Sequence, residues 1–154
     1  MPGSADLVRL LGWEPKREPE LSWGDAEEHL GFPFPGDYKE LLSVFGSGVF
    51  DHVVEVVSPI EDDESLDVFF SDIYESKEFD GLVQWGRAGR CTLFWRTGAD
   101  DPDQWTITWC DAEFSEWESY DGPTTAFLFD LLTGKIASRL IEFTPARKPG
   151  FWPA

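Results

Sequence analysis

The spacing of apolar residues changes at Gly81, and this change limits the fold more than any other feature of the sequence. Before it, apolar residues recur three, four and seven positions apart, as along 38–45, which is the pattern of a helix with one buried face. After it they alternate with polar residues, as along 105–109, which is typical of half-buried strands. Helices followed by a strand meander, without strand–helix alternation, indicate the α+β class.

We expect one domain over residues 1–154, because no repeat and no long linker divides the chain. N-terminal helices would pack on an antiparallel β-sheet meander, with a further helix near the C-terminus and a Pro-rich tail over 144–154. Ser4 and Ser22 are the expected N-caps of the first two helices. The expected helices span 4–11, 22–30, 35–45, 61–78 and 123–132. The expected strands span 49–58, 82–85, 92–96, 105–109 and 117–120.

The apolar faces of these elements predict the core. The residues expected to be buried are Tyr38, Leu41, Leu42, Phe45, Phe69, Phe70, Ile73, Leu93, Ile107, Phe127 and Leu131. One or two of the eight tryptophans are expected to remain exposed at an interface, where this residue is enriched.

The two cysteines, Cys91 and Cys110, are too few and too far apart for a disulfide framework or a zinc site. If Trp95 pairs with Trp105 across the turn between two strands, then Cys91 pairs with Trp109. Cys110 then points to the other face of the sheet. Both thiols are therefore expected to be free.

The formal net charge of −18 is concentrated in two stretches. Residues 61–80 contain nine acids and one base, and residues 100–121 contain eight acids and no Lys or Arg. Such a field repels nucleic acid and anionic membranes and attracts basic partners. An acidic surface can also serve solubility alone, so the charge by itself fits either role.

The binding surface is expected among the acids of these two stretches. The candidate residues are Glu61, Asp62, Asp63, Glu64, Asp100, Asp101, Asp103, Glu113, Glu116 and Glu118. The Asp-rich turn at 100–103 resembles the start of a calcium loop but lacks its sixth-position glycine and its twelfth-position glutamate, so we expect no dedicated metal site.

Catalytic motifs are not recognisable in the sequence. The Gly-Ser-Gly at 46–48 follows a helix and lacks the frame of a nucleophile elbow. The only histidines, His29 and His52, have no spacing that suggests a catalytic pair. We therefore expect no enzyme activity and no cofactor. The lack of a leader and of any run of about 18 apolar residues suggests a cytoplasmic protein.

Residues 23–48 resemble the N-terminal signature of the SUKH superfamily: E-x-x-L-G, a short extended piece to L-P, then D-Y-K and a helix ending in a glycine turn. Phe34 replaces the commoner leucine, and Ser47 interrupts a frequent Asn-Gly-Gly. The matching residues are Glu27, Leu30, Gly31, Phe34, Pro35, Asp37, Tyr38, Lys39, Gly46 and Gly48. Later segments resemble the actinobacterial branch, so the resemblance covers about residues 20–140. Those segments are Trp85-Gly86, Leu93-Phe94-Trp95, Pro102 with Trp105-Thr106, and 127–134.

The resemblance implies a domain that binds another protein, since several SUKH relatives are immunity proteins that neutralise bacterial toxins, often nucleases. Other relatives are regulatory scaffolds, so a regulatory adaptor unrelated to toxins stays the alternative. A nuclease needs a basic groove for its substrate, and two strongly acidic stretches suit such a groove. We expect a cognate toxin as the partner, bound in the cytoplasm, with no nucleic-acid or membrane ligand.

Overall fold

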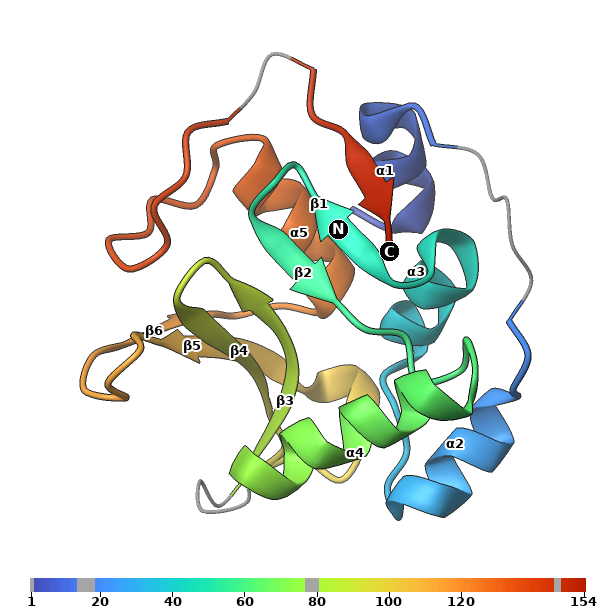
Figure 1. Ribbon diagram of the computed structural model, residues 1–154. Helices are drawn as coiled ribbons and strands as arrows, with labels where there is room; N and C mark the ends of the chain where they lie inside the picture. The colour runs from blue at the N-terminus through green and yellow to red at the C-terminus, as the bar shows by residue number, and fades with distance from the viewer. Residues whose placement is uncertain (1, 14–18, 77–80, 146–147) are drawn as a thin grey trace.

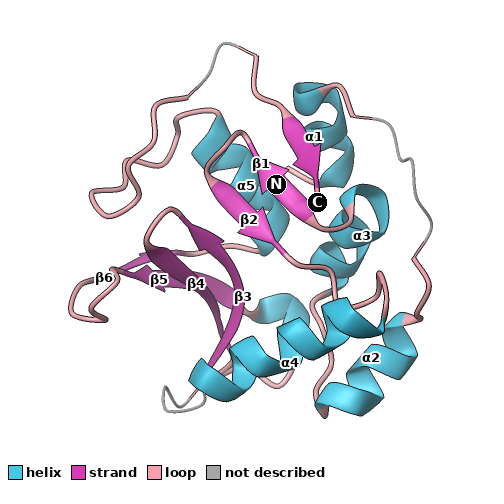
Figure 2. Cartoon of the chain, viewed as in Figure 1, coloured by secondary structure: helices cyan, strands magenta, loops and turns pink. Residues whose placement is uncertain are grey.

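The computed structural model describes the chain apart from residues 1, 14–18, 77–80 and 146–147, and apart from the side chains of 73–76. Its described part contains five helices and a seven-stranded sheet in the order β6-β5-β4-β3-β2-β1-β7, with every neighbouring pair antiparallel (Figure 1). The class is therefore α+β, as the sequence predicts. Figure 2 shows β1, β2 and β7 at one end of the sheet and β5 and β6 at the other.

The helices are α1 (Ser4–Leu11), α2 (Trp23–Leu30), α3 (Gly36–Phe45), α4 (Asp63–Ser76) and α5 (Thr124–Leu132), with a short 3-10 helix η1 at Pro102–Gln104. The strands are β1 (Gly48–Phe50), β2 (Val54–Val56), β3 (Leu82–Ala88), β4 (Cys91–Arg96), β5 (Thr106–Cys110), β6 (Trp117–Tyr120) and β7 (Phe151–Pro153). Ser22 caps α2, and its hydroxyl accepts from the amide of Asp25 at 3.1 Å. The cap predicted at Ser4 is wrong by one residue, because Gly3 precedes the helix and donates to Asp6.

The strand predicted over 49–58 is in fact a hairpin of β1 and β2. Asp51 and His52 adopt positive φ angles of 47° and 60°, and the amide of Val53 donates to the carbonyl of Phe50 at 3.0 Å. Two successive residues with positive φ make the tight turn whose twist matches antiparallel strands, and Asp and His tolerate this conformation better than most residues. The run of valines in this segment predicted one continuous strand and gave no sign of the turn.

The β4–β5 hairpin has a register two residues away from the predicted one. Trp95 pairs with Ile107, and Leu93 pairs with Trp109. Trp105 lies before β5, where its indole N–H donates to the carbonyl of Ala99 at 2.8 Å and so closes a longer turn that includes η1. A shift by two residues keeps each side chain on its face, so the predicted faces remain correct.

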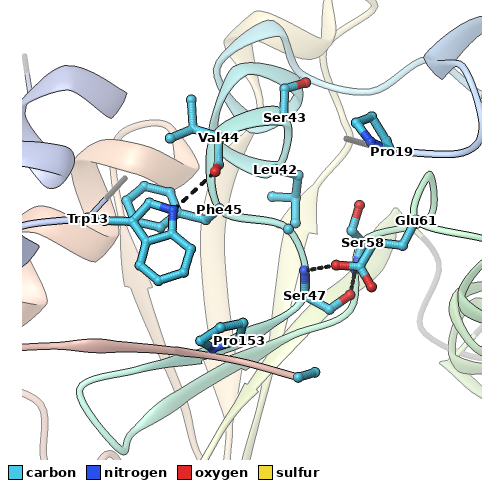
Figure 3. Close-up of a pocket in the computed structure, with 12 residues that line it drawn as sticks. Trp13, Pro19, Leu42, Ser43, Val44, Phe45, Ser47, Ser58, Glu61 and Pro153 are labelled. Carbon is cyan, nitrogen blue, oxygen red and sulfur yellow. Dashed lines mark hydrogen bonds between the residues drawn. The ribbon is translucent and has the colours of Figure 1, made fainter. Parts of the chain in front are cut away.

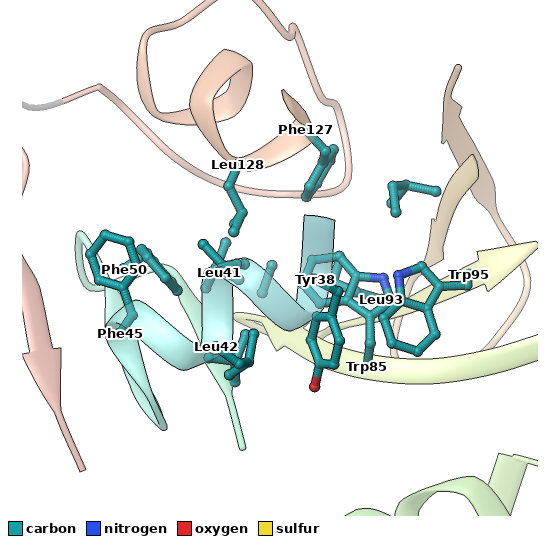
Figure 4. Close-up of a cluster of buried hydrophobic side chains, with 14 of the residues drawn as sticks. Tyr38, Leu41, Leu42, Phe45, Phe50, Trp85, Leu93, Trp95, Phe127 and Leu128 are labelled. Atoms are coloured by element: carbon teal, nitrogen blue, oxygen red, sulfur yellow. The ribbon is translucent and has the colours of Figure 1, made fainter. Parts of the chain in front are cut away.

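The core lies between one face of the sheet and the helices α3 and α5. The Tyr38 ring contacts Trp95 at 4.7 Å between centroids (Figure 4). Phe127 contacts Trp109 at 5.1 Å between centroids. Nine of the eleven predicted core residues are buried, whereas the side chain of Ile73 falls outside the description. Phe70 contradicts the prediction with 45% exposure, because α4 turns Leu66 and Phe69 towards the core and Phe70 away from it.

The Pro-rich segment at the C-terminus ends in β7, which pairs with β1 and forms one edge of the sheet. Phe151 packs against Phe45 and Phe50 with ring centroids 5.0 and 4.7 Å apart. Gly48 makes this approach possible, since a Cβ there would lie 2.4 Å from the backbone oxygen of Trp152. The C-terminal strand therefore completes the end of the core beside α1 and α3.

Candidate protein-binding surface

The acids at the start of α4 serve two purposes. The carboxylate of Asp62 accepts from the amide of Ser65 at 2.8 Å and caps the helix, and that of Glu61 accepts from the amide of Ser47. Asp63 and Glu64 are exposed on the first turn of α4. Their negative charges interact favourably with the positive, N-terminal end of the helix dipole and remain accessible to solvent.

The acids of the turn before β5 also differ in the contacts that they make. Asp103 accepts from the amide of Gly36 at 2.7 Å, so it satisfies the first turn of α3 from a distant part of the chain. Asp101 caps η1 by accepting from the amide of Asp103 at 2.9 Å. Asp100 is exposed. All three side chains are exposed, and Asp100 is the one to which no hydrogen bond is found in the described part of the chain.

Glu118 on β6 is a structural residue. Its carboxylate accepts from the indole N–H of Trp109 at 2.9 Å, the hydroxyl of Ser138 at 2.6 Å, and the amides of Arg139 and Leu140 at 3.1 Å each. Burial raises the pKa of Glu118, but these hydrogen bonds outweigh it and hold the pKa below its ordinary value. The ionised form of Glu118 therefore fastens the 138–140 loop to the sheet.

The neighbouring acids of the β5–β6 connection differ from one another. Glu116 forms an exposed ion pair with Arg139 at 3.0 Å, and Glu113 is exposed. Asp111 accepts from the hydroxyl and amide of Ser115, both at 2.7 Å, and these bonds hold its pKa below the ordinary value. Acids that look equivalent in the sequence therefore have different roles in the fold.

The ten candidate acids form three separate groups. Asp103 lies at the first residue of α3 and Glu61 lies just beyond its last, so a helix of ten residues, roughly 15 Å long, separates them. The third group lies on the β5–β6 connection, at the edge of the sheet opposite β7 (Figure 1). The candidates therefore lie at three places on the described fold.

The cysteine and histidine side chains do not come together in a catalytic or metal-binding site. Cys91 and Cys110 are both free, and the pairing of Thr92 with Cys110 places them on opposite faces, as predicted. Burial raises the pKa of both thiols, that of Cys110 to about 11. His52 stacks on Trp152, and His29 contacts Phe70. Within the described ranges, no three His, Cys, Asp or Glu side chains are grouped as metal ligands.

Several aromatic side chains are exposed. Phe114 is 43% and Trp117 is 40% exposed, both beside the acids of the β5–β6 connection, and Trp152 lies exposed at the other edge of the sheet. The expectation of one or two exposed tryptophans is therefore confirmed, whereas their place in an interface stays a prediction.

A cavity of about 250 Å³ opens at the C-terminal end of α3. Figure 3 shows the side chains of Trp13, Leu42 and Phe45 on one side, with Ser47, Ser58 and Glu61 gathered on another. The end of α1, the end of α3, the segment after β2 and the end of β7 all contribute to it. Sequence analysis selected Glu61 for its charge and missed the cavity, because its walls come from several segments that are distant in the sequence.

Residues 20–121 match the SUKH_6 family, described as SMI1-KNR4 cell-wall. The chain belongs to this family. No curated protein and no solved structure shows a match to it. The match covers α2 to β6, and therefore the segment in which the sequence already resembles SUKH proteins. Assignment to an actinobacterial branch stays a prediction.

The signature of this SUKH_6 domain maintains the fold. Glu27 accepts from the amide of Phe34 at 2.7 Å and pairs with Lys39 at 3.0 Å, so it fixes the extended segment between α2 and α3. Gly31 ends α2 with a φ of 84°, which only glycine adopts without strain. Asp37 accepts from the amide of Thr125 at 2.9 Å and joins α3 to α5, while its burial raises its pKa. These signature residues therefore stabilise the fold.

The helices that the structure describes are too short or too polar to cross a membrane. The SUKH_6 domain thus presents exposed acids, exposed aromatic rings and the cavity at the end of α3 as its candidate binding features.

Proposed function

We propose that this SUKH_6 domain is a non-enzymatic immunity protein that binds a cognate toxin through the toxin's basic surface. The observation that carries the proposal is the excess of uncompensated acids. The chain has 30 acids and 12 Lys and Arg residues, and its described part contains four ion pairs. The excess of acids over Lys and Arg leaves a net charge of −18 that the chain's own bases cannot compensate.

The exposed acids are the ones that can contribute to binding. Asp63, Glu64, Asp100 and Glu113 are exposed, and no hydrogen bond to them is found in the described part of the chain. A surface of this sign accelerates encounters with a basic protein and repels nucleic acid. A toxin that cleaves nucleic acid requires a basic groove, so it is the partner that this charge fits best. Family membership supports the proposal through the immunity proteins among SUKH relatives.

A regulatory adaptor is the second candidate function. The description of the matched family, SMI1-KNR4 cell-wall, favours it, because it refers to cell-wall proteins and not to toxins. An adaptor would use the same exposed acids and aromatic rings to bind a different protein. Both candidates share a cytoplasmic site of action and neither requires a cofactor.

Growth rescue separates the candidates. The toxin encoded beside this gene would be expressed with the wild-type chain or with a variant carrying Asp63→Lys, Glu64→Lys, Asp100→Lys and Glu113→Lys. We expect the wild type to restore growth and the variant to fail. Binding of the wild type should also weaken as salt rises, since screening limits the field to about 8 Å at physiological ionic strength.

The control is a variant with Asn or Gln at the same four positions, which loses four charges without adding bases and should rescue partially. Thermal melting checks that all variants fold, because exposed substitutions each change stability by less than about 0.5 kcal/mol. Full rescue by the folded Lys variant would refute the electrostatic interface. A wild-type chain that binds no neighbouring toxin but recovers a cell-wall regulator would favour the adaptor.

A further inference from the structure

Helices α2 and α4 lie side by side and are connected at two places (Figure 1). Just before the helices begin, the amide of Leu21 donates to the carbonyl of Ile60 at 2.9 Å. Further along, the His29 ring of α2 contacts the Phe70 ring of α4 edge to face, with centroids 5.8 Å apart. The hydrogen bond and the ring contact therefore fix how the outer sides of the two helices lie relative to each other.

Phe70 is an apolar ring at the surface of this helix pair. It is 45% exposed, whereas the preceding residue, Phe69, is 2% exposed and packs in the core. Covering such a ring removes a large apolar area from water and is favourable. Single exposed apolar residues are common on proteins, so the ring indicates a binding surface only together with its surroundings.

Acids accompany the Phe70 ring on both helices. Asp63 and Asp67 precede Phe70 at helical spacing, so the three residues share one side of α4. Asp25 lies one turn before His29 and shares its side of α2. The three carboxylates are exposed, and neither helix contains a Lys or an Arg. We call the side formed by Asp25, His29, Asp63, Asp67 and Phe70 the α2–α4 surface.

The charge of the α2–α4 surface decides which partner fits it. A second copy of the chain would bring the same acids against it, and nucleic acid or an anionic membrane would bring phosphates, so like charges oppose all three. A cationic segment with one apolar side complements both features of the surface. Its Lys and Arg residues can meet the carboxylates while its apolar residues cover the ring.

We propose that the α2–α4 surface binds a cationic amphipathic segment of the partner protein, with Phe70 as the apolar anchor and the carboxylates of Asp25, Asp63 and Asp67 around it. The inference rests on the proposed protein-binding function and names the surface that performs it. An aromatic side chain that becomes buried at the centre of an interface, within a ring of weaker contacts, is the arrangement in which few residues carry most of the binding energy.

The probe is a synthetic peptide of Leu and Lys whose leucines recur at helical spacing, so that the peptide has one apolar side as a helix. The full chain, labelled with ¹⁵N, is titrated with this peptide. We expect the largest shifts at the amides of His29, Asp67 and Phe70, with a Kd on the order of 100 μM. A peptide of the same composition in scrambled order has the same charge without the apolar side, and it should bind about ten-fold more weakly.

Phe70→Ala should weaken peptide binding by about ten-fold, because the apolar anchor is lost. Val68→Ala is the matched control and should leave binding unchanged. Val68 is 42% exposed on the same helix, but it lies on another side of α4, where it lines a cavity with Arg87 of β3. Asp67→Lys should weaken binding more than Glu113→Lys, which makes the same change of charge on the β5–β6 connection. Thermal melting checks that the four variants fold.

Equal losses in the Phe70 and Val68 variants, or largest shifts on the β5–β6 connection, would overturn the proposal. Equal binding of the scrambled peptide would overturn it as well, since charge alone would then explain the attraction. The probe contains no toxin. A chain that binds the peptide as expected and does not rescue growth therefore supports this surface and refutes only the toxin as the partner.

Discussion

The two acidic stretches of this chain carry the same net charge but differ in structure. In 61–76, the acids Asp63, Glu64 and Asp67 lie exposed on α4, and the helix is attached to the core by Leu66 and Phe69. In 100–121, five of the eight acids accept hydrogen bonds or pair with the chain itself. In 61–76, by contrast, Glu61, Asp62 and Asp72 have internal partners, and the other acids whose side chains are described are exposed. The comparison teaches that stretches of equal charge can differ in how many of their acids the fold itself uses.

The largest expected effect tests how α4 is attached. Phe69→Ala should lower the free energy of unfolding by about 3–5 kcal/mol, because it leaves a cavity against Phe34 in the core. Phe70→Ala is the matched control and should cost less than about 1 kcal/mol, since this ring is exposed. Urea denaturation would measure both values. Equal losses would mean that both rings hold α4 to the core.

The second effect tests the structural acids of the other stretch. Glu118→Ala should lower the free energy of unfolding by about 2–3 kcal/mol, because the buried Trp109 N–H and the 138–140 loop lose their acceptor. Glu113→Ala removes the same charge from an exposed position five residues earlier and should change little. If urea denaturation shows wild-type stability for both variants, Glu118 is not the structural acid that its hydrogen bonds indicate.

A third, smaller effect is the pH dependence of the contribution that Glu118 makes to stability. The folded-state pKa of Glu118 lies below its ordinary value of 4.5, so its contribution is complete above about pH 5 and is lost as pH falls through the folded-state pKa. The stability difference between wild type and Glu118→Ala should therefore shrink between pH 6 and pH 3. Urea titrations of both proteins at each pH would show it, and a difference that grows on acidification would contradict the assignment.

The smallest effect concerns the exposed acids. Asp63→Asn and Asp100→Asn, one from each stretch, should each change stability by less than about 0.5 kcal/mol. Asp103→Ala, three residues from Asp100, should cost more, because the amide of Gly36 loses its acceptor. Thermal melting of the three variants would rank them, and a costly Asp100→Asn would show that this acid also serves the fold.

Local patterns predicted the elements well where a periodic apolar face was long. The helices predicted over 35–45 and 123–132 are confirmed within a residue, because their apolar spacing and their Pro and Gly boundaries agree. The pattern failed for 49–58, where valines suggested one strand and two residues of positive φ made a turn. It also failed at Phe70, because the spacing of apolar residues along a helix does not show how wide the buried face of that helix is.

The sequence by itself determined the class, the family and the order of the elements, because periodicity, capping residues and the signature are local properties of the chain. Only the tertiary structure decided which acids are available. Three of the four hydrogen-bond donors to Glu118 come from a loop twenty residues later, and the cavity that Glu61 lines forms where several distant segments meet. Charge is set by residue type, but its role is set by the neighbours that folding brings within hydrogen-bonding distance.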